Sequence, residues 1–154
     1  MRVITHSGVE EVPATVVATI RRRVPVDDLP SFFQAAYGQL MAAVTQAGGS
    51  MGGPPFGWYH GVPTDLVDVS AGFPVAGDVH TPEGGVLIYE RPAGRAVVGL
   101  HIGPYETLPS TYAALEKFAA EQGVVPFGEM WEEYLTEPSG DPSTWQTRVV
   151  LLLE

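Results

Sequence analysis

Hydrophobic residues recur along this chain with two different spacings. Alternation of apolar and polar side chains, rich in β-branched residues, predicts half-buried β-strands in four segments. These segments are residues 14–20, 66–73, 95–102 and 146–153. Two more strands are expected after the Pro-Phe-Gly triplets at residues 55–57 and 126–128.

Helical spacing appears in two places. The first helix is expected to begin at Asp27 or Asp28 and to end at Gly48, and the second to begin at Glu106-Thr107 and to end at Gly123. Each has a proline in its first turn and a glycine after its last, which are typical helix boundaries. Their apolar faces carry Phe33, Ala36, Leu40 and Val44 in the first, and Leu108, Tyr112, Leu115 and Phe118 in the second.

The two sets of elements follow one another in the same order and share sequence. Residues 11–14 (EVPA) match residues 90–93 (ERPA), and the two Leu-Pro-Ser triplets match at the same offset. The Pro-Phe-Gly triplets match at a shorter offset, because GGSMGGP precedes only the first. Internal similarity of this kind predicts a duplicated βαββ unit, with repeats at about 11–75 and 86–154. The alternative is that Leu-Pro-Ser merely begins two ordinary helices.

This organisation predicts a single α+β domain over residues 1–154. The two βαββ units would form antiparallel sheets with both helices on one face. Related units usually pack about a pseudo-twofold axis. We therefore expect a central ligand cleft on that axis.

Composition narrows the functional classes. The net charge is −10, with only eight Lys and Arg residues, so we expect no nucleic-acid partner. The chain lacks cysteine, and its four histidines show no paired metal spacing, so we expect no disulfide, metal or other cofactor. No signal peptide or long apolar run is present, which predicts a cytoplasmic protein without a membrane partner.

The stretch EMWEEYLTEP, residues 129–138, concentrates the candidate chemistry. Because side chains alternate along a strand, Glu132 and Tyr134 are expected to share one face, with Trp131 and Glu133 on the other. A carboxylate and a tyrosine would then point together into the protein. The alternative is that Glu132 pairs with Arg95 or Arg148, or is solvated at a sheet edge.

Three motifs resemble the GyrI-like small-molecule-binding domains, which also form the effector-binding ends of multidrug-responsive MerR-type and AraC-type regulators. They are ERPAG at residues 90–94, HIGPYETL at 101–108 and WEEYLTEP at 131–138. The resemblance covers nearly the whole chain. It implies a duplicated βαββ domain with an aromatic-lined cleft. At its floor, Glu132 would receive lipophilic cations beside Tyr134.

The resemblance also implies partners. No DNA-binding helices precede the matching region, so we expect a free-standing module that binds a small hydrophobic or cationic ligand. A regulator protein or a second copy of the chain is its expected macromolecular partner.

Further ligand contacts are expected from aromatic residues. Trp58, Tyr59 and Trp131 are candidate flat walls for cations and aromatic ligands, although core packing explains such residues as often. Tyr105 is a candidate because the first repeat has Val26 at that position. His101 lies in the Gly-Pro-Tyr segment and is expected to have a satisfied ring, and it is included among the candidate ligand contacts.

The internal repeat allows the position of Glu132 to be compared with its counterpart in the first repeat. Extending the Pro-Phe-Gly alignment places Gly61 opposite Glu132. Only one repeat would then supply a carboxylate. The glycines of GGSMGGP are expected to let this loop move as a lid over Trp58 and Tyr59.

Two functions are consistent with these residues. The first is a binding protein that sequesters or senses toxic lipophilic compounds. The second is a hydrolase that opens strained electrophilic rings of genotoxic natural products, with Glu132 activating water and Tyr134 stabilising the oxyanion. Haem binding, known for a related fold, is not expected because no histidine is singled out as an axial ligand.

Overall fold

The computed structural model describes residues 4–61, 64–77, 79, 85–137 and 139–153. The chain forms two compact units. Unit 1 consists of residues 1–12 and 94–154, and unit 2 consists of residues 13–93. Each unit has its own group of antiparallel strands, its own long helix and its own core between the helix and those strands.

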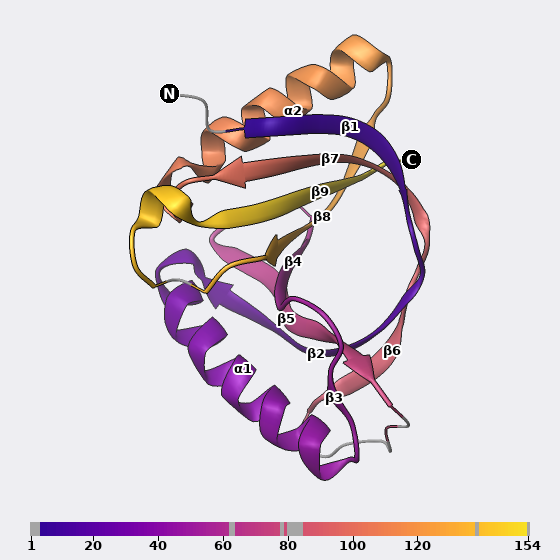
Figure 1. Ribbon diagram of the computed structural model, residues 1–154, viewed down its shortest axis with the longest axis vertical. Helices are drawn as coiled ribbons and strands as arrows, with labels where there is room; N and C mark the ends of the chain where they lie inside the picture. Colours follow the sequence, from indigo (N-terminus) through magenta and orange to yellow (C-terminus); the bar gives the residue numbers. More distant parts are fainter. Residues whose placement is uncertain (1–3, 62–63, 78, 80–84, 138, 154) are drawn as a thin grey trace. The chain divides into compact units, whose positions relative to one another are not determined.

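Unit 1 is built on a sheet with the strand order β1-β7-β9-β8, in which all neighbours are antiparallel (Figure 1). A short 3-10 turn, η2, leads directly into α2, and another, η3, precedes β9. Its elements are β1 (Ile4–Val12), β7 (Gly94–Ile102), η2 (Tyr105–Thr107), α2 (Leu108–Gln122), β8 (Pro126–Tyr134), η3 (Pro142–Thr144) and β9 (Gln146–Leu153).

Unit 2 repeats this plan with the order β6-β2-β5-β4, again antiparallel throughout. The turn η1 leads into α1, and the short strand β3 pairs with β5. Its elements are β2 (Thr15–Pro25), η1 (Val26–Asp28), α1 (Leu29–Gln46), β3 (Ser50–Met51), β4 (Phe56–His60), β5 (Leu66–Ala76) and β6 (Leu87–Arg91).

The fold is α+β, as predicted, but each unit takes one strand from the other half of the sequence. Strand β1 pairs with β7 in unit 1, and β6 pairs with β2 in unit 2. Neither β1 nor β6 was expected as a strand. Because these pairings join distant segments, the unit boundaries at Val12/Pro13 and Ala93/Gly94 differ from the predicted repeat boundaries. The assignment of residues 1–154 to a single domain stays a prediction.

Both helices begin and end close to where local signals placed them. Asp28 and Thr107 occupy the N-cap positions, and a proline follows in the first turn of each helix. At the C-terminal end of α2, Gly123 adopts a left-handed conformation with φ of 70°. Glycine takes this conformation without a steric penalty, so the helix ends there.

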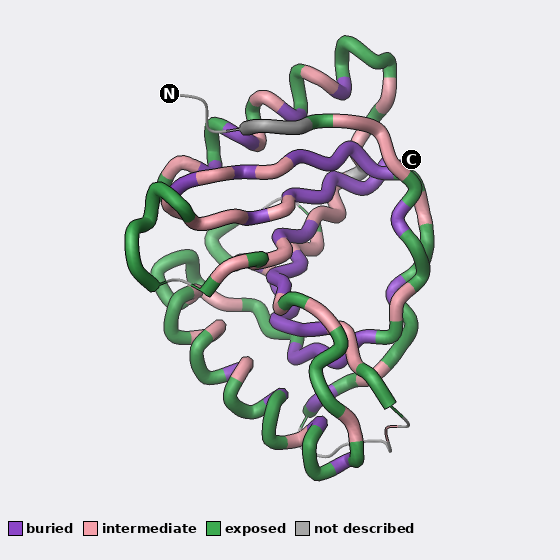
Figure 2. The backbone as a smooth tube through the Cα atoms, in the orientation of Figure 1, coloured by how far each residue is buried: buried purple, intermediate pink, exposed green. Residues whose placement is uncertain are grey.

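One face of each helix packs on its own sheet. In unit 1 the fully buried Leu115 of α2 meets Val97 of β7 and Val149 of β9. In unit 2 Leu40 of α1 packs on β2 and β5. Figure 2 shows long buried stretches along β7 and β9. The side chains of β8 and β9 that share a face with Val149 are therefore directed at α2.

The glycine-rich segment 48–54 is paired with β5 in this structure, and its expected movement as a lid stays a prediction. Ser50 and Met51 form β3 and pair with Ala76 and Val75 of β5. The Gly52 amide also donates a 2.7 Å hydrogen bond to the Pro74 carbonyl. Backbone pairing of this kind strengthens the link between the segment and β5.

No helix among the described residues is long and apolar enough to span a membrane.

Candidate functional site

Strand β8 presents Glu132 and Tyr134 to α2. Glu132 pairs with Val149 across β9 and Tyr134 pairs with Thr147, and Val149 belongs to the core beneath α2. Directly paired residues share a sheet face, so both side chains point toward the helix. The predicted facing of the strand is confirmed.

The Glu132 carboxylate is buried, with only 7% of the residue exposed. Tyr112, on α2, donates a 2.5 Å hydrogen bond to Oε2, and Tyr134 donates a 2.9 Å bond to Oε1. Both carboxylate oxygens are therefore held by neutral phenol donors. No Lys or Arg forms an ion pair with Glu132 in the part of the chain that the structure describes.

This environment changes the acidity of Glu132. Burial raises the pKa of the carboxyl, because the charged form loses hydration. The hydrogen bonds from Tyr112 and Tyr134, and the proximity of His101, act in the opposite direction but do not cancel the effect of burial on the pKa. A cation placed at this carboxylate would stabilise its charged form.

The opposite face of β8 has separate chemistry. Trp131 is 1% exposed and donates a 2.8 Å hydrogen bond from Nε1 to Glu133. Arg148 forms an ion pair with Glu133 at 3.1 Å and a longer one with Glu10. Arg148 therefore pairs with Glu133 and not with Glu132. Trp131, a predicted ligand contact, lies on the face of β8 away from the Glu132 carboxylate.

His101 anchors the turn that precedes α2. Its ring is fully buried, with Nδ1 at 2.6 Å from the Thr111 hydroxyl and Nε2 at 3.0 Å from the Pro104 carbonyl. Because a carbonyl oxygen only accepts hydrogen bonds, Nε2 carries a hydrogen. The Thr107 hydroxyl also donates to the Pro104 carbonyl, at 2.8 Å. The expected satisfied ring is present, and it fixes the backbone that carries Tyr105.

Tyr105 links Tyr134 to an aromatic residue that sequence analysis missed. Its ring centroid lies 5.7 Å from that of Tyr134 and 5.0 Å from that of Trp145. Trp145 is held in place by a 2.9 Å hydrogen bond from Nε1 to the Ser139 carbonyl. These half-buried rings form an aromatic row beside Glu132. No periodic signal marks Trp145, because it lies in the turn before β9.

Sequence analysis also missed Tyr112 as a site residue, because its spacing predicted only a position on the apolar face of the second helix. The repeat alignment sets it opposite Phe33, so the change from phenylalanine to tyrosine was the one available signal. The hydroxyl gained by that change is the group that reaches Glu132.

The remaining candidates belong to unit 2. Trp58 is buried, and its ring centroid lies 4.7 Å from that of His60 and 6.3 Å from that of Tyr89. Tyr59 is half-buried on the adjacent position of β4. Their roles as ligand contacts stay predictions.

The strand registers correct the residue that corresponds to Glu132 in unit 2. Ala18 corresponds to Val97 in the repeat alignment. Ala18 pairs with Phe73 and Val97 pairs with Leu151, so Phe73 corresponds to Leu151 and, two residues earlier, Ala71 corresponds to Val149. Val149 pairs with Glu132 and Ala71 pairs with Gly57, so Gly57 corresponds to Glu132. The expected residue was Gly61.

Strand β8 has a register shift between Pro126 and Met130, with Gly128 at φ of 94°, so the two Pro-Phe-Gly triplets are not equivalent. By the same registers, Tyr59 corresponds to Tyr134.

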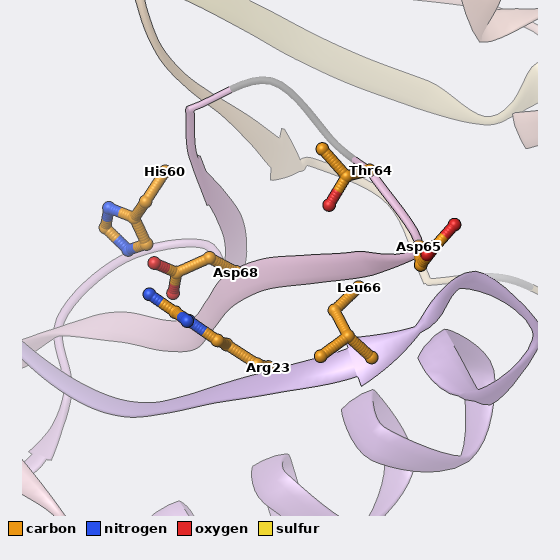
Figure 3. Close-up of a pocket in the computed structure, with 6 residues that line it drawn as sticks. All are labelled: Arg23, His60, Thr64, Asp65, Leu66 and Asp68. Carbon is orange, nitrogen blue, oxygen red and sulfur yellow. The ribbon is translucent and has the colours of Figure 1, made fainter.

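Unit 2 also contains an open polar pocket of about 430 Å³, away from the Glu132 cluster in sequence and chemistry. Figure 3 shows Arg23 and His60 approaching Asp68 from two sides, with Leu66 nearby. Asp68 itself is bound by Arg21 through two 2.8 Å hydrogen bonds, which hold its pKa below the usual value. Most lining residues are exposed, so this pocket offers little apolar surface to a lipophilic molecule.

No cluster of three or more His, Asp or Glu side chains suited to a metal ion occurs within the described ranges.

Comparison with known proteins identifies relatives of the whole chain. The family model described as the GyrI-like small molecule binding domain matches residues 7–154. A search of curated protein sequences found no significant match.

Solved structures extend this comparison. The C-terminal domain of EcmrR is 25% identical with a TM-score of 0.83, and the match covers 97% of each chain. In a complex of EcmrR with DNA, the match covers 97% of this chain but only 57% of EcmrR. This chain thus spans little more than half the length of that protein.

Two more distant structures share the fold. A hydrolase from Listeria innocua is 16% identical with a TM-score of 0.69, over 96% of this chain and 91% of that one. The protein SAV2435, solved with tetraphenylphosphonium, is 9% identical with a TM-score of 0.70, over 97% and 94%.

Proposed function

Since the chain belongs to the family of GyrI-like small-molecule-binding domains, we propose that it binds lipophilic cations, with Glu132 as the group that receives the positive charge. The compound would be sequestered or reported to a partner protein. EcmrR, which has a similar domain, is seen bound to DNA, so the comparison does not support excluding a nucleic-acid partner. A regulator protein or a second copy of this chain stays the predicted macromolecular partner.

One observation carries the proposal: Glu132 is buried and receives two phenol hydrogen bonds, but no cationic side chain among the described residues pairs with it. A buried carboxylate without a counter-charge is costly, and its pKa rises accordingly. A ligand cation would supply the missing charge. The free energy of binding would then include the removal of the energetic penalty of burying the Glu132 carboxylate without a counter-charge.

The surroundings of Glu132 favour a ligand with flat apolar groups. Tyr105, Tyr134 and Trp145 stand in a row beside the carboxylate. Aromatic faces attract cations and stack on aromatic rings, with each such contact contributing about 0.5–2 kcal/mol. A small hydrated cation such as Na⁺ would gain none of this stacking.

The test compares Glu132→Gln with the unchanged protein in binding tetraphenylphosphonium, followed by calorimetry and tryptophan fluorescence. The substitution keeps size and removes charge. Affinity for the cation is expected to fall by about 1–3 kcal/mol, as for other hydrogen bonds and contacts to charged groups. Affinity for the neutral triphenylphosphine oxide is expected to change little. Trp145 should report binding because it contacts Tyr105.

Glu133→Gln is the matched control, because Glu133 is the neighbouring carboxylate on the opposite face of β8. The Glu133→Gln variant is expected to lose the ion pair with Arg148 and to keep its affinity for the cation. If Glu133→Gln weakens cation binding while Glu132→Gln does not, the proposed anchor is wrong.

Hydrolysis is the second candidate function, favoured by the pairing of a carboxyl of raised pKa with two phenols. In ring opening, Glu132 would take a proton from water as the water oxygen bonds to a ring carbon. The bond that breaks would leave its electrons on the opposite ring atom, and a tyrosine hydroxyl would protonate it. A proton returning from Glu132 would restore the tyrosine.

Turnover separates the two functions. A panel of epoxide- and cyclopropane-bearing aromatic compounds, followed by mass spectrometry for addition of water, would reveal a hydrolase. Product formation that disappears in Tyr112→Phe or Tyr134→Phe would support the catalytic role. Stable binding without product would leave the binding function alone.

A further inference from the structure

The polar layer beneath α2 contains one buried hydroxyl that its neighbours do not satisfy. Thr147 is fully buried on β9, and its Oγ1 has no hydrogen-bond partner among the described residues. The other polar groups of this layer are engaged: His101 with Thr111 and Pro104, and Tyr134 with Glu132.

Thr147 occupies the centre of this layer. It pairs with His101 on β7 and with Tyr134 on β8, so the three side chains share the sheet face toward α2. Glu132 pairs with Val149, two residues along β9, and is therefore a diagonal neighbour of Thr147. Diagonal neighbours in antiparallel sheets are roughly 7–8 Å apart.

An unpaired hydroxyl at this position is not required for packing. A buried polar group without a partner costs about 1–3 kcal/mol, and more than about 90% of buried polar groups in native proteins are paired. By the strand registers, unit 2 has the fully buried Val69 at the corresponding position. Valine has nearly the shape of threonine. The same framework thus accepts an apolar side chain where unit 1 has a hydroxyl.

The immediate neighbours indicate where a partner would enter. His101 is fully buried and bonded at both ring nitrogens, which holds it in place. Tyr134 and Tyr105 are only half-buried. A ligand held at Glu132 and against these two rings would therefore approach Thr147 from the side of the aromatic row rather than from the side of His101.

We propose that Thr147 is a second polar contact in the small-molecule site, donating a hydrogen bond to an acceptor oxygen of the ligand while Glu132 receives its positive charge. This inference rests on the proposed function. It narrows the ligand to lipophilic cations that carry an ether, hydroxyl or carbonyl oxygen roughly 7–8 Å or less from the charge. A purely hydrocarbon cation would use Glu132 alone.

The experiment uses the full chain and two related cations. Tetraphenylphosphonium has no acceptor atom, whereas (4-methoxyphenyl)triphenylphosphonium adds one ether oxygen. Thr147→Val removes the hydroxyl and keeps the shape, and Thr147→Ser keeps the hydroxyl. Calorimetry gives the ratio of the affinities for the two cations in each variant. A packing change that weakens the binding of both cations equally leaves this ratio unchanged.

The unchanged protein and Thr147→Ser are expected to prefer the methoxy compound. In Thr147→Val that preference should fall about fivefold or more, the size expected for one hydrogen bond. Affinity for tetraphenylphosphonium should stay the same. Thermal unfolding should show Thr147→Val to be at least as stable as the unchanged protein, because an unpaired buried hydroxyl has been removed.

Two outcomes would overturn the inference in different ways. If both cations bind and Thr147→Val leaves their affinity ratio unchanged, Thr147 is not a ligand contact, although Glu132 can still be the anchor. If the unchanged protein binds neither cation, the proposed function fails and this inference fails with it.

Discussion

Units 1 and 2 use the same framework with different chemistry. In both, a 3-10 turn leads into a helix with proline in its first turn, and the helix packs on an antiparallel sheet. Where unit 1 has Glu132, unit 2 has Gly57. Four further site residues of unit 1, namely Tyr112, Tyr105, His101 and Thr147, correspond to Phe33, Val26, Arg22 and Val69, whereas Tyr134 corresponds to the identical Tyr59.

This difference shows that a similar helix–sheet framework forms in unit 2 without these polar residues. The cores differ in detail as well, since the large and small residues are exchanged: Ala36 and Leu40 on α1 correspond to Leu115 and Ala119 on α2, and all four are buried. The helix–sheet packing tolerates this exchange because the combined volume is conserved. This exchange concerns apolar packing only, and a binding role for the residues around Glu132 stays a proposal.

The largest effect is expected from placing a carboxylate in unit 2. Gly57→Glu would place a charge at a buried position of unit 2, where Phe33, the counterpart of Tyr112, has no hydroxyl to donate to it. We expect a loss of about 3–5 kcal/mol in the free energy of unfolding, the size seen for uncompensated buried charges. Urea denaturation would measure it. Gly57→Gln controls for size, and equal losses in both variants would show that crowding, not charge, is responsible.

The exchanged leucines should be equally important to their units. Leu40→Ala and Leu115→Ala each remove a fully buried side chain and should each lower the free energy of unfolding by about 2–5 kcal/mol. Denaturant unfolding followed by tryptophan fluorescence would measure both. A small loss for only one of them would mean that the two helix–sheet cores are not packed alike.

Two buried or partly buried acids should make stability depend on pH with opposite signs. The pKa of Glu132 is raised by burial, so its contribution to stability is complete at low pH and is lost as the pH rises through the folded-state pKa. Glu132→Gln should remove this loss and be the more stable protein at neutral pH. Cation affinity of the unchanged protein should rise over the same pH range, because the ligand needs the ionised form.

Asp68 in unit 2 provides the contrasting case. Its hydrogen bonds from Arg21 lower its pKa, so its contribution is present above the ordinary aspartate value and is lost as the pH falls through the folded-state pKa. Asp68→Asn should therefore be destabilised at neutral pH and not in acid. Unfolding curves measured from acid to neutral pH would decide the signs, and the same sign for both variants would contradict this account.

The smallest effect is expected at the other end of that ion pair. Arg21 is half-exposed, with 51% of its side chain accessible. Exposed ion pairs contribute roughly 0–1 kcal/mol, so Arg21→Met should cost less than about 1 kcal/mol. The corresponding residues in unit 1 are Leu100 and Gln146, which form no such pair. A loss that persists at high salt would show that the arginine acts through packing rather than charge.

Local signals in the sequence determined the helices and the direction of the key side chains. Pro30 and Pro109 mark the first turns of the helices and Gly123 ends the second through their own backbone preferences, which act over a few residues. The alternation of side chains along β8 fixed the shared face of Glu132 and Tyr134, because the period of a strand does not depend on its partners. The family motifs supplied the expectation of a GyrI-like small-molecule-binding domain, which the family match then confirmed.

Only the tertiary structure decided which distant residues meet. The pairing of β1 with β7 and of β6 with β2 depends on contacts between residues that are 68 to 97 positions apart in the sequence, and no local pattern encodes it. The approach of Tyr112 to Glu132, the row through Trp145 and the unsatisfied hydroxyl of Thr147 all follow from how α2 and the turns lie on their sheet. The equivalence of Gly57, not Gly61, with Glu132 likewise required the strand registers, because the bulge in β8 shifts its residues relative to their partners.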